Sequence, residues 1–329
     1  MLLRIFYKQQ WYTPFLLAIT GLALWQRALI NPSDSLEYVG ENIGPLFDRM
    51  IPFFHDHPTA AILITFVLMM FQAFFITHLA SSKVLKNRFS AITGLIFILL
   101  TSSRPFMLAP QAGYFAGVFI LLAFNKILNT YAPKDVILQI FNAGLLISLA
   151  GLFYFPAWSF FILLIISLAI YYVISFRTVI AALTGFITPL FFLFVILWVS
   201  GQLEGFTTSF SQYQDNWLSP DFSFTRYDRI YLYILGFLTI LSLFSLRMLH
   251  MPAKVIVVRK RMLTLSVALV VAVLSYAVAG KHLLVNQSLL IIPLSVALAV
   301  FFEDLDRRIL AESLFLLTAI ILAAGHLLV

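Results

Sequence analysis

Residues 156–200 read PAWSFFILLIISLAIYYVISFRTVIAALTGFITPLFFLFVILWVS, with Arg177 as the only charged residue. A helix needs about 20 predominantly apolar residues to cross the hydrocarbon of a bilayer, and this stretch holds two such runs in succession. The runs are continuous, whereas the strands of a membrane β-barrel alternate polar and apolar residues. We therefore predict two neighbouring transmembrane helices, 156–176 and 178–200.

The whole chain has the same apolar character. Of its 329 residues, 62% are hydrophobic and only 11% are charged, and the mean hydropathy is +0.99. A soluble domain carries about 25% charged residues, so this composition excludes an ordinary soluble enzyme. We predict an all-α, polytopic transmembrane bundle that forms one membrane domain over residues 1–329. About eleven spans are expected, near 12–30, 58–80, 89–103, 106–125, 136–153, 156–176, 178–200, 229–247, 262–280, 283–302 and 309–328.

The charged residues predict the orientation of these spans. With the N-terminus in the cytoplasm and residues 12–30 kept as an uncleaved span, fifteen of the 21 lysines and arginines fall in cytoplasmic loops. Nine of the 14 acidic residues fall on the outer side. The net charge of +7 therefore reflects the orientation of the spans in the membrane, and we expect no nucleic-acid partner. The absence of cysteine excludes thiol catalysis and thiolate metal sites.

The first outer loop, residues 31–57, carries a pair of acidic residues. Asp34 and Glu37 are three apart, so on a helical turn they share a face. Two carboxylates placed in this way can act as base and partner, or hold a divalent cation. In a second, compatible interpretation, Asp34 or Ser33 caps a short helix and Glu37 is a first-turn acid favoured by the helix dipole.

An amphipathic segment and two histidines follow in the same loop. Apolar residues recur at helical spacing over about 42–51, which predicts a helix lying in the membrane interface, and Pro52 is expected to end it. The triplet His55, Asp56 and His57 carries side chains that bind transition metals. Contiguous residues lack the i, i+4 spacing at which helical histidines converge, so we assign no metal site and favour a polar cap on the second span.

Arg104 lies at the outer side between two short predicted spans, 89–103 and 106–125, which fit a tilted hairpin or a re-entrant pair. A buried arginine there can clamp a phosphate through bidentate hydrogen bonds. In the alternative, Arg104 only snorkels from the tip of a hairpin. Lys281 and His282, in the tight turn between two late spans, are a second candidate for phosphate contact.

The second outer loop, residues 201–228, mixes aromatic and acidic side chains, among them Glu204 and Trp217. A sugar-binding surface needs aromatic faces for stacking and carboxylates for hydroxyl groups. The interfacial aromatic belt of membrane proteins gives the same composition, so both interpretations stay open. No P-loop, glycine-rich dinucleotide turn, His-Glu-x-x-His motif or nucleophile elbow is present.

The order of these features resembles the membrane-embedded glycosyltransferases of the GT-C fold, which use polyprenyl-phosphate-linked sugars. In that fold the first span precedes an outer loop with a catalytic acid and interfacial helices, and a further long outer loop follows the seventh span. The corresponding features here are the loops 31–57 and 201–228. The acid pair is Asp-x-x-Glu, whereas many members carry adjacent Asp-Glu. The overall pattern of the sequence also resembles that of a multi-pass inner-membrane family of Bacteroidota.

The GT-C resemblance implies a bacterial inner-membrane enzyme that transfers a sugar from a polyprenyl-phosphate carrier to an envelope glycan, lipid or protein acceptor on the periplasmic face. Asp34 would act as base on the acceptor hydroxyl, and Glu37 would position the acceptor or a divalent cation. Arg104, with Lys281, would stabilise the leaving lipid phosphate. The remaining expected substrate contacts are Glu204, Trp217 and His282.

Two alternatives come from other classes of protein. A lipid or solute transporter would need polar residues at mid-membrane in repeat-related broken helices, and the sequence shows no inverted repeat. A non-catalytic subunit that scaffolds an envelope-assembly complex would bind membrane lipids and partner proteins without any catalytic group. Convergence of Asp34, Glu37 and Arg104 on one cavity favours the enzyme, and side chains pointing apart into water favour the scaffold.

Overall fold

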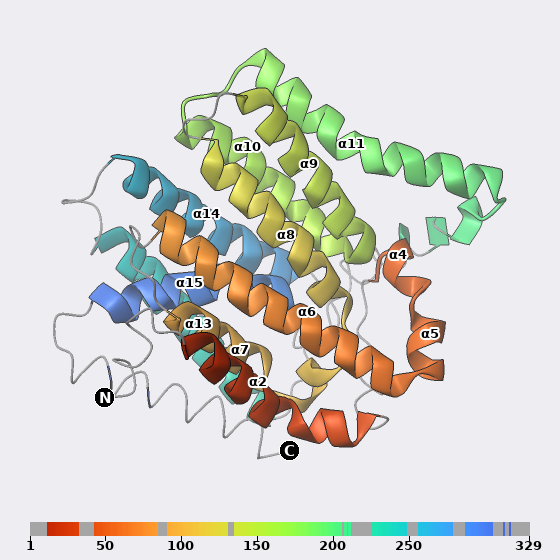
Figure 1. The fold of residues 1–329 in the computed structure, drawn as a ribbon. Coiled ribbons are helices and arrows are strands. Elements are labelled where there is room, and N and C mark those ends of the chain that lie inside the picture. The colour runs from red at the N-terminus through yellow and green to blue at the C-terminus, as the bar shows by residue number, and fades with distance from the viewer. Residues whose placement is uncertain are drawn as a thin grey trace.

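The computed structural model of the chain is helical throughout its described part (Figure 1). The structure describes residues 12–32, 43–84, 91–130, 135–205, 207–208, 210–211, 226–248, 256–278 and 287–304, together with residues 312 and 316. Five of the expected site residues lie outside these ranges, namely Asp34, Glu37, Trp217, Lys281 and His282, as does the alternative helix cap Ser33.

Twelve α-helices make up the described part of the chain. They are α2 (Thr13–Ile30), α4 (Pro45–Asp48), α5 (Ile51–Asp56), α6 (Pro58–Leu79), α7 (Ile92–Thr101), α8 (Ala112–Asn129), α9 (Val136–Phe153), α10 (Phe160–Ile170), α11 (Phe176–Val199), α13 (Arg226–Met248), α14 (Ile256–Val278) and α15 (Ser288–Asp304). A π-helical turn continues α6, and 3₁₀ turns precede α8 and α10; these are η2 (Ala80–Val84), η3 (Pro105–Leu108) and η4 (Phe155–Ser159).

Six of these helices, by their length and apolar composition, can cross a membrane: α2, α6, α8, α9, α11 and α13. The chain is therefore a multi-pass helical membrane protein. Eleven spans were expected, and three of them coincide with shorter apolar helices of the described part, at 92–101, 155–170 and 288–303. The last expected span, 309–328, falls almost entirely outside the described residues.

Helices α7 and α15 form the centre of the bundle. Every residue of α7 except Leu99 is buried, and residues 287–302 are buried throughout. Ten residues of helix rise about 15 Å, half of the roughly 30 Å of hydrocarbon, and the residues that follow α7 are also buried. Helix α7 therefore ends inside the bundle, as a re-entrant element does, because the polar sequence 102–104 stops it early.

The first outer loop differs from the single helix expected over 42–51. Two short helices, α4 and α5, are separated by a turn at residues 49–50. Pro52 lies in the first turn of α5, where its missing N–H costs no helical hydrogen bond, so it helps to begin a helix. Phe47 and Phe54, one from each short helix, are buried and attach the loop to the bundle.

Helices α9 and α11 cross in backbone contact. A Cβ atom added at Gly144 of α9 would lie 2.5 Å from the carbonyl oxygen of Ala182. A Cβ atom added at Gly185 of α11 would collide with the carbonyl oxygen of Phe141. Small residues allow membrane helices to approach this closely and gain dispersion contacts, so the crossing depends on the two glycines.

We predict that Gly185→Ala destabilises the protein, because the new methyl group meets backbone atoms that move only with their helix. Overpacking of this kind costs about 1–3 kcal/mol. The measurement is the thermal unfolding temperature of the purified protein in detergent. Gly236→Ala is the matched control, since a Cβ atom at Gly236 has no neighbour within 4 Å. Equal unfolding temperatures for the two variants would contradict the prediction.

Candidate functional site

Arg104 lies in the turn between α7 and η3 and is 5% exposed. Trp25 lies five residues before the end of α2. Its Nε1 donates a hydrogen bond to Ser102 Oγ, in the same turn, at 3.0 Å. The Trp25 ring is also 5.7 Å from that of Phe66, eight residues after the start of α6. At 1.5 Å per residue, this turn lies roughly 8–12 Å below the ends of both helices. Arg104 is thus a buried charge packed among candidate membrane spans, and charges within membrane spans usually have a function.

The C-terminal end of α2 and the N-terminal end of α6 lie at the outer end of the bundle in the predicted orientation. Here hydroxyl groups complete the hydrogen bonding of α7, whose last carbonyl groups have no donor within the helix. Ser103 Oγ donates to the Leu100 carbonyl at 2.8 Å. The Tyr114 hydroxyl shares its hydrogen between the carbonyl groups of Met107 at 2.8 Å and Thr101 at 3.2 Å. These bonds allow α7 to end inside an apolar bundle, and they hold the turn that carries Arg104.

Two distant helices bring polar side chains to this turn. The hydroxyl of Tyr231, from α13, lies 2.9 Å from Ser103 Oγ and donates to Oε1 of Gln287 at 3.0 Å. Gln287 Nε2 in turn donates to the sulfur of Met107 at 2.7 Å. Arg104 Cζ lies 5.3 Å from the centre of the Tyr231 ring, within cation–π distance. We call Ser103, Arg104, Tyr231 and Gln287 the outer polar cluster.

Tyr231 and Gln287 were missed by the reasoning from sequence. Tyr231 stands in the run Ile230–Leu235, where an interfacial tyrosine is ordinary. Gln287 directly precedes an apolar helix, where a polar residue is equally ordinary. The available signal was that both flank the outer ends of predicted spans, as Arg104 does. That signal is weak, because it does not show which spans are neighbours.

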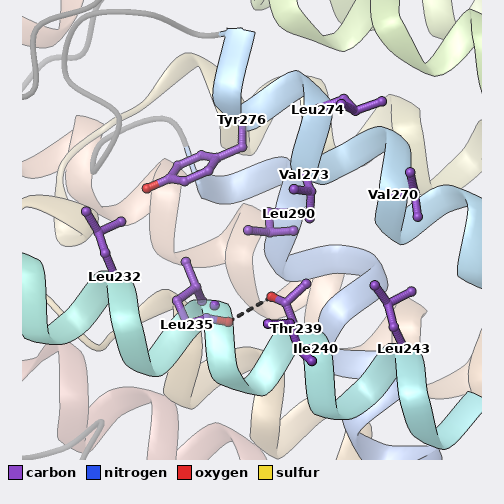
Figure 2. A pocket seen from close by; sticks show the side chains of 11 residues that line it. Leu232, Leu235, Thr239, Ile240, Leu243, Val270, Val273, Leu274, Tyr276 and Leu290 are labelled. Carbon is purple, nitrogen blue, oxygen red and sulfur yellow. Dashed lines mark hydrogen bonds between the residues drawn. The ribbon is translucent and has the colours of Figure 1, made fainter.

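An apolar groove of about 410 Å³ runs between α13 and α14 (Figure 2). Leucine, isoleucine and valine side chains line most of it, and Leu290 of α15 lies between its two walls. Thr239 donates its hydroxyl to the Leu235 carbonyl at 2.8 Å and so offers little polarity to the groove. From Leu232 to Leu243 the groove is about 17 Å long at the rise of an α-helix. These properties fit a single hydrocarbon chain.

The groove and the outer polar cluster share two helices. Tyr231 of the cluster directly precedes Leu232 of the groove, and Gln287 lies one helical turn before Leu290. Tyr276 stands at the same end, on the side of Leu232 in Figure 2. Its hydroxyl is buried and has no hydrogen-bond partner within the described part of the chain. The outer end of the apolar groove therefore lies beside polar groups.

The other predicted site residues do not join this cluster. Glu204 follows α11 and is exposed. His55, Asp56 and His57 are exposed at the end of α5, and the ring of His57 packs edge-on against that of Phe53 at 5.1 Å. Across the described ranges, no three His, Cys, Asp or Glu side chains lie close enough to hold a metal ion.

Comparisons of the chain with protein-family models, with curated proteins and with solved structures find no match. Function is therefore inferred from the outer polar cluster and the groove beside it.

We predict that Tyr231→Phe lowers the stability of the protein. The substitution removes the hydroxyl that contacts Ser103 and Gln287, and leaves a buried amide oxygen without its donor. Such a loss costs about 1–3 kcal/mol. Thermal unfolding in detergent measures it, with Tyr233→Phe as the matched control, since Tyr233 is on the same helix and 75% exposed. If both variants unfold together with the wild type, the cluster does not stabilise the fold.

Proposed function

We propose that the protein is a glycosyltransferase of the bacterial inner membrane, similar to GT-C enzymes in the order of its loops. It transfers a sugar from a polyprenyl-phosphate carrier to an envelope glycan, lipid or protein acceptor on the periplasmic face. The eleven-span topology with a cytoplasmic N-terminus belongs to this proposal. The observation that carries it is that buried Arg104 contacts the ring of Tyr231, the residue that directly precedes an apolar groove fitting a lipid chain.

The chemistry of Arg104 supports an anionic substrate. A guanidinium is always charged and offers planar donors that match a phosphate. Arg104 is buried at one end of the bundle, and a lipid phosphate that reached it would meet these donors away from bulk water. The cation–π contact with Tyr231 holds the side chain near this end of the bundle.

The groove between α13 and α14 supports the lipid portion of that substrate. Its lining is almost wholly apolar, Tyr276 lines it on the side of Leu232, and Tyr231 directly precedes Leu232 in the chain. A lipid with its chain in the groove would carry its phosphate toward the outer polar cluster. The unpartnered Tyr276 hydroxyl would then have an acceptor.

The reaction follows from the roles assigned to the acids. Asp34 removes the proton of the acceptor hydroxyl, whose oxygen attacks the anomeric carbon of the sugar. The bond from that carbon to the phosphate oxygen breaks, and polyprenyl phosphate leaves with the electron pair. Arg104 stabilises the charge that develops on the phosphate, with Lys281 as its assistant. Glu37 positions the acceptor or a divalent cation.

We predict that Arg104→Gln abolishes sugar transfer, because removal of one charge-stabilising donor costs about 10²–10³ in rate. The measurement is the envelope glycan profile, by mass spectrometry, of cells that lack the gene and are complemented with each variant. Wild type restores the missing sugar. Arg229→Gln, which removes an exposed arginine close to Tyr231 on α13, restores it as well.

Blots must show equal protein levels for all variants. Asp34→Ala, tested in the same cells, distinguishes an enzyme from a scaffold. An enzyme loses the sugar with both Arg104→Gln and Asp34→Ala. Rescue by Asp34→Ala removes this residue as the base and favours a scaffold. Full rescue by Arg104→Gln contradicts the proposal.

We predict that filling the groove also blocks transfer. Gly236 lines the groove, and a side chain there has free space. Gly236→Phe occupies the volume that the lipid chain would take, whereas Gly236→Ala leaves most of it open. In the same complementation assay, the phenylalanine variant is expected to lose the sugar and the alanine variant to keep it. Equal rescue by both variants would exclude the groove as the lipid site.

A further inference from the structure

A second apolar crevice lies on another face of the bundle, against the outer half of α11. Pro189 lies four residues after Gly185, where α11 crosses α9. A proline inside a helix lacks the N–H of one helical hydrogen bond. The end of α11 reaches past the ends of α9 and α10 (Figure 1). The crevice has a volume of about 320 Å³ and is lined by Trp158, Leu190, Leu193, Phe194, Leu197 and Phe210.

This crevice lies at the depth of lipid chains. Helix α11 is a candidate membrane span with a mean hydropathy of 2.5. The residues beside the crevice are large and exposed, with Phe192 at 60% and Trp198 at 69%. An apolar cavity does not retain water, and the apolar molecules available at this depth are the chains of membrane lipids.

A positive charge stands at the outer mouth of the crevice. Gly201, at φ 68°, turns the chain back after α11, and the N–H of Gln202 donates to the Leu197 carbonyl at 2.9 Å. Arg49, in the turn between α4 and α5, donates through Nη2 to Gln202 Oε1 at 2.8 Å. Gln202 thereby connects Arg49 to the end of α11, within one turn of the crevice residue Leu197.

Within the described part of the chain, Arg49 has more hydrogen-bond donors than partners. A guanidinium carries five N–H groups, and the bond to Gln202 uses one of them. Both side chains are exposed, just beyond the end of the candidate span α11. An arginine at a span end places its charge among the headgroups while apolar residues below face the chains.

We propose that this crevice and Arg49 together bind one phospholipid of the outer leaflet. An acyl chain lies between α11 and η4, and the phosphate is held by the free N–H groups of Arg49. The bound lipid connects α11 to the α4–α5 turn. The site uses α11 and η4, whereas the groove of the proposed enzyme lies between α13 and α14. The two proposals share the predicted orientation but no lining residue, so each can fail without the other.

The test is photolabelling of the full-length protein in vesicles of phosphatidylethanolamine and phosphatidylglycerol. The probe is phosphatidylglycerol with a diazirine in its acyl chain, and labelled residues are mapped by mass spectrometry. Peptides containing residues 190–197 are expected to be labelled severalfold more than the lipid-facing residues Ile162 and Ile166 of α10, which are exposed. Equal labelling of both regions would overturn the proposal.

Two variants test the two parts of the site. Leu190→Trp fills the crevice and should remove the excess labelling, and Arg49→Gln should reduce it severalfold. Arg27→Gln, which removes an exposed arginine at the outer end of α2, should leave it unchanged. A diazirine-bearing diacylglycerol, which lacks phosphate, should label the crevice weakly and equally in wild type and Arg49→Gln.

Three results would overturn the proposal. One is labelling of the crevice that neither Leu190→Trp nor Arg49→Gln changes. Another is equal strong labelling by phosphatidylglycerol and diacylglycerol probes, which would exclude recognition of the phosphate. The third concerns a photoreactive residue placed at position 194 and activated in native membranes. If it cross-links to a protein and to no lipid, the crevice is a contact for a partner helix.

Discussion

Helix α7 ends among buried side chains, and this constraint organises the centre of the bundle. The carbonyl groups at a helix end need donors, and in hydrocarbon each unsatisfied group costs several kcal/mol. Ser103 and Tyr114 supply those donors. The same turn then holds the buried Arg104, and α13 and α15 supply Tyr231 and Gln287 around it. The half-length helix and the buried charge thus belong to one arrangement.

The outer polar cluster and the groove give this arrangement a functional interpretation. A polar network closed on itself would only stabilise the fold, as many buried networks do. Here an apolar groove begins one residue away, and a buried tyrosine hydroxyl at its end has no partner in the described part of the chain. A charged head with a long apolar tail fits both features at once. The proposed polyprenyl-phosphate substrate has that form.

The two apolar hollows of the bundle lie on different helices and differ in their charged neighbours. The groove between α13 and α14 begins at Leu232, next to Tyr231, whose ring contacts the buried Arg104. The crevice at α11 ends at Leu197, one turn from Gln202, which bonds the exposed Arg49. A buried arginine suits a bound substrate whose charge is shielded from water. An exposed arginine suits a headgroup that stays at the surface. The physical distinction is the extent to which each phosphate would be removed from solvent.

Sequence reasoning located Arg104 but not its partners. An arginine between two short apolar runs is visible in any sequence, since charges are rare there. Tyr231 and Gln287 are unremarkable residues at the ends of spans, and only the packing of α15 against α7 and α13 makes them neighbours. Pro52 was expected to end a helix and instead lies in the first turn of α5, because a proline is tolerated at either place. In place of the single helix expected over 42–51, the structure has α4 and the start of α5, with a turn at residues 49–50 between them.

The sequence by itself determined that this protein is a helical membrane protein, because burial in hydrocarbon demands long apolar runs that composition reveals directly. It also determined that α7 is short, since the polar residues 102–104 interrupt the apolar run. Only the tertiary structure decided that Arg104 is buried, which side chains surround it and where the apolar hollows lie. Hydropathy is a property of each segment alone, whereas contacts depend on which segments are neighbours, and almost every segment here is equally apolar.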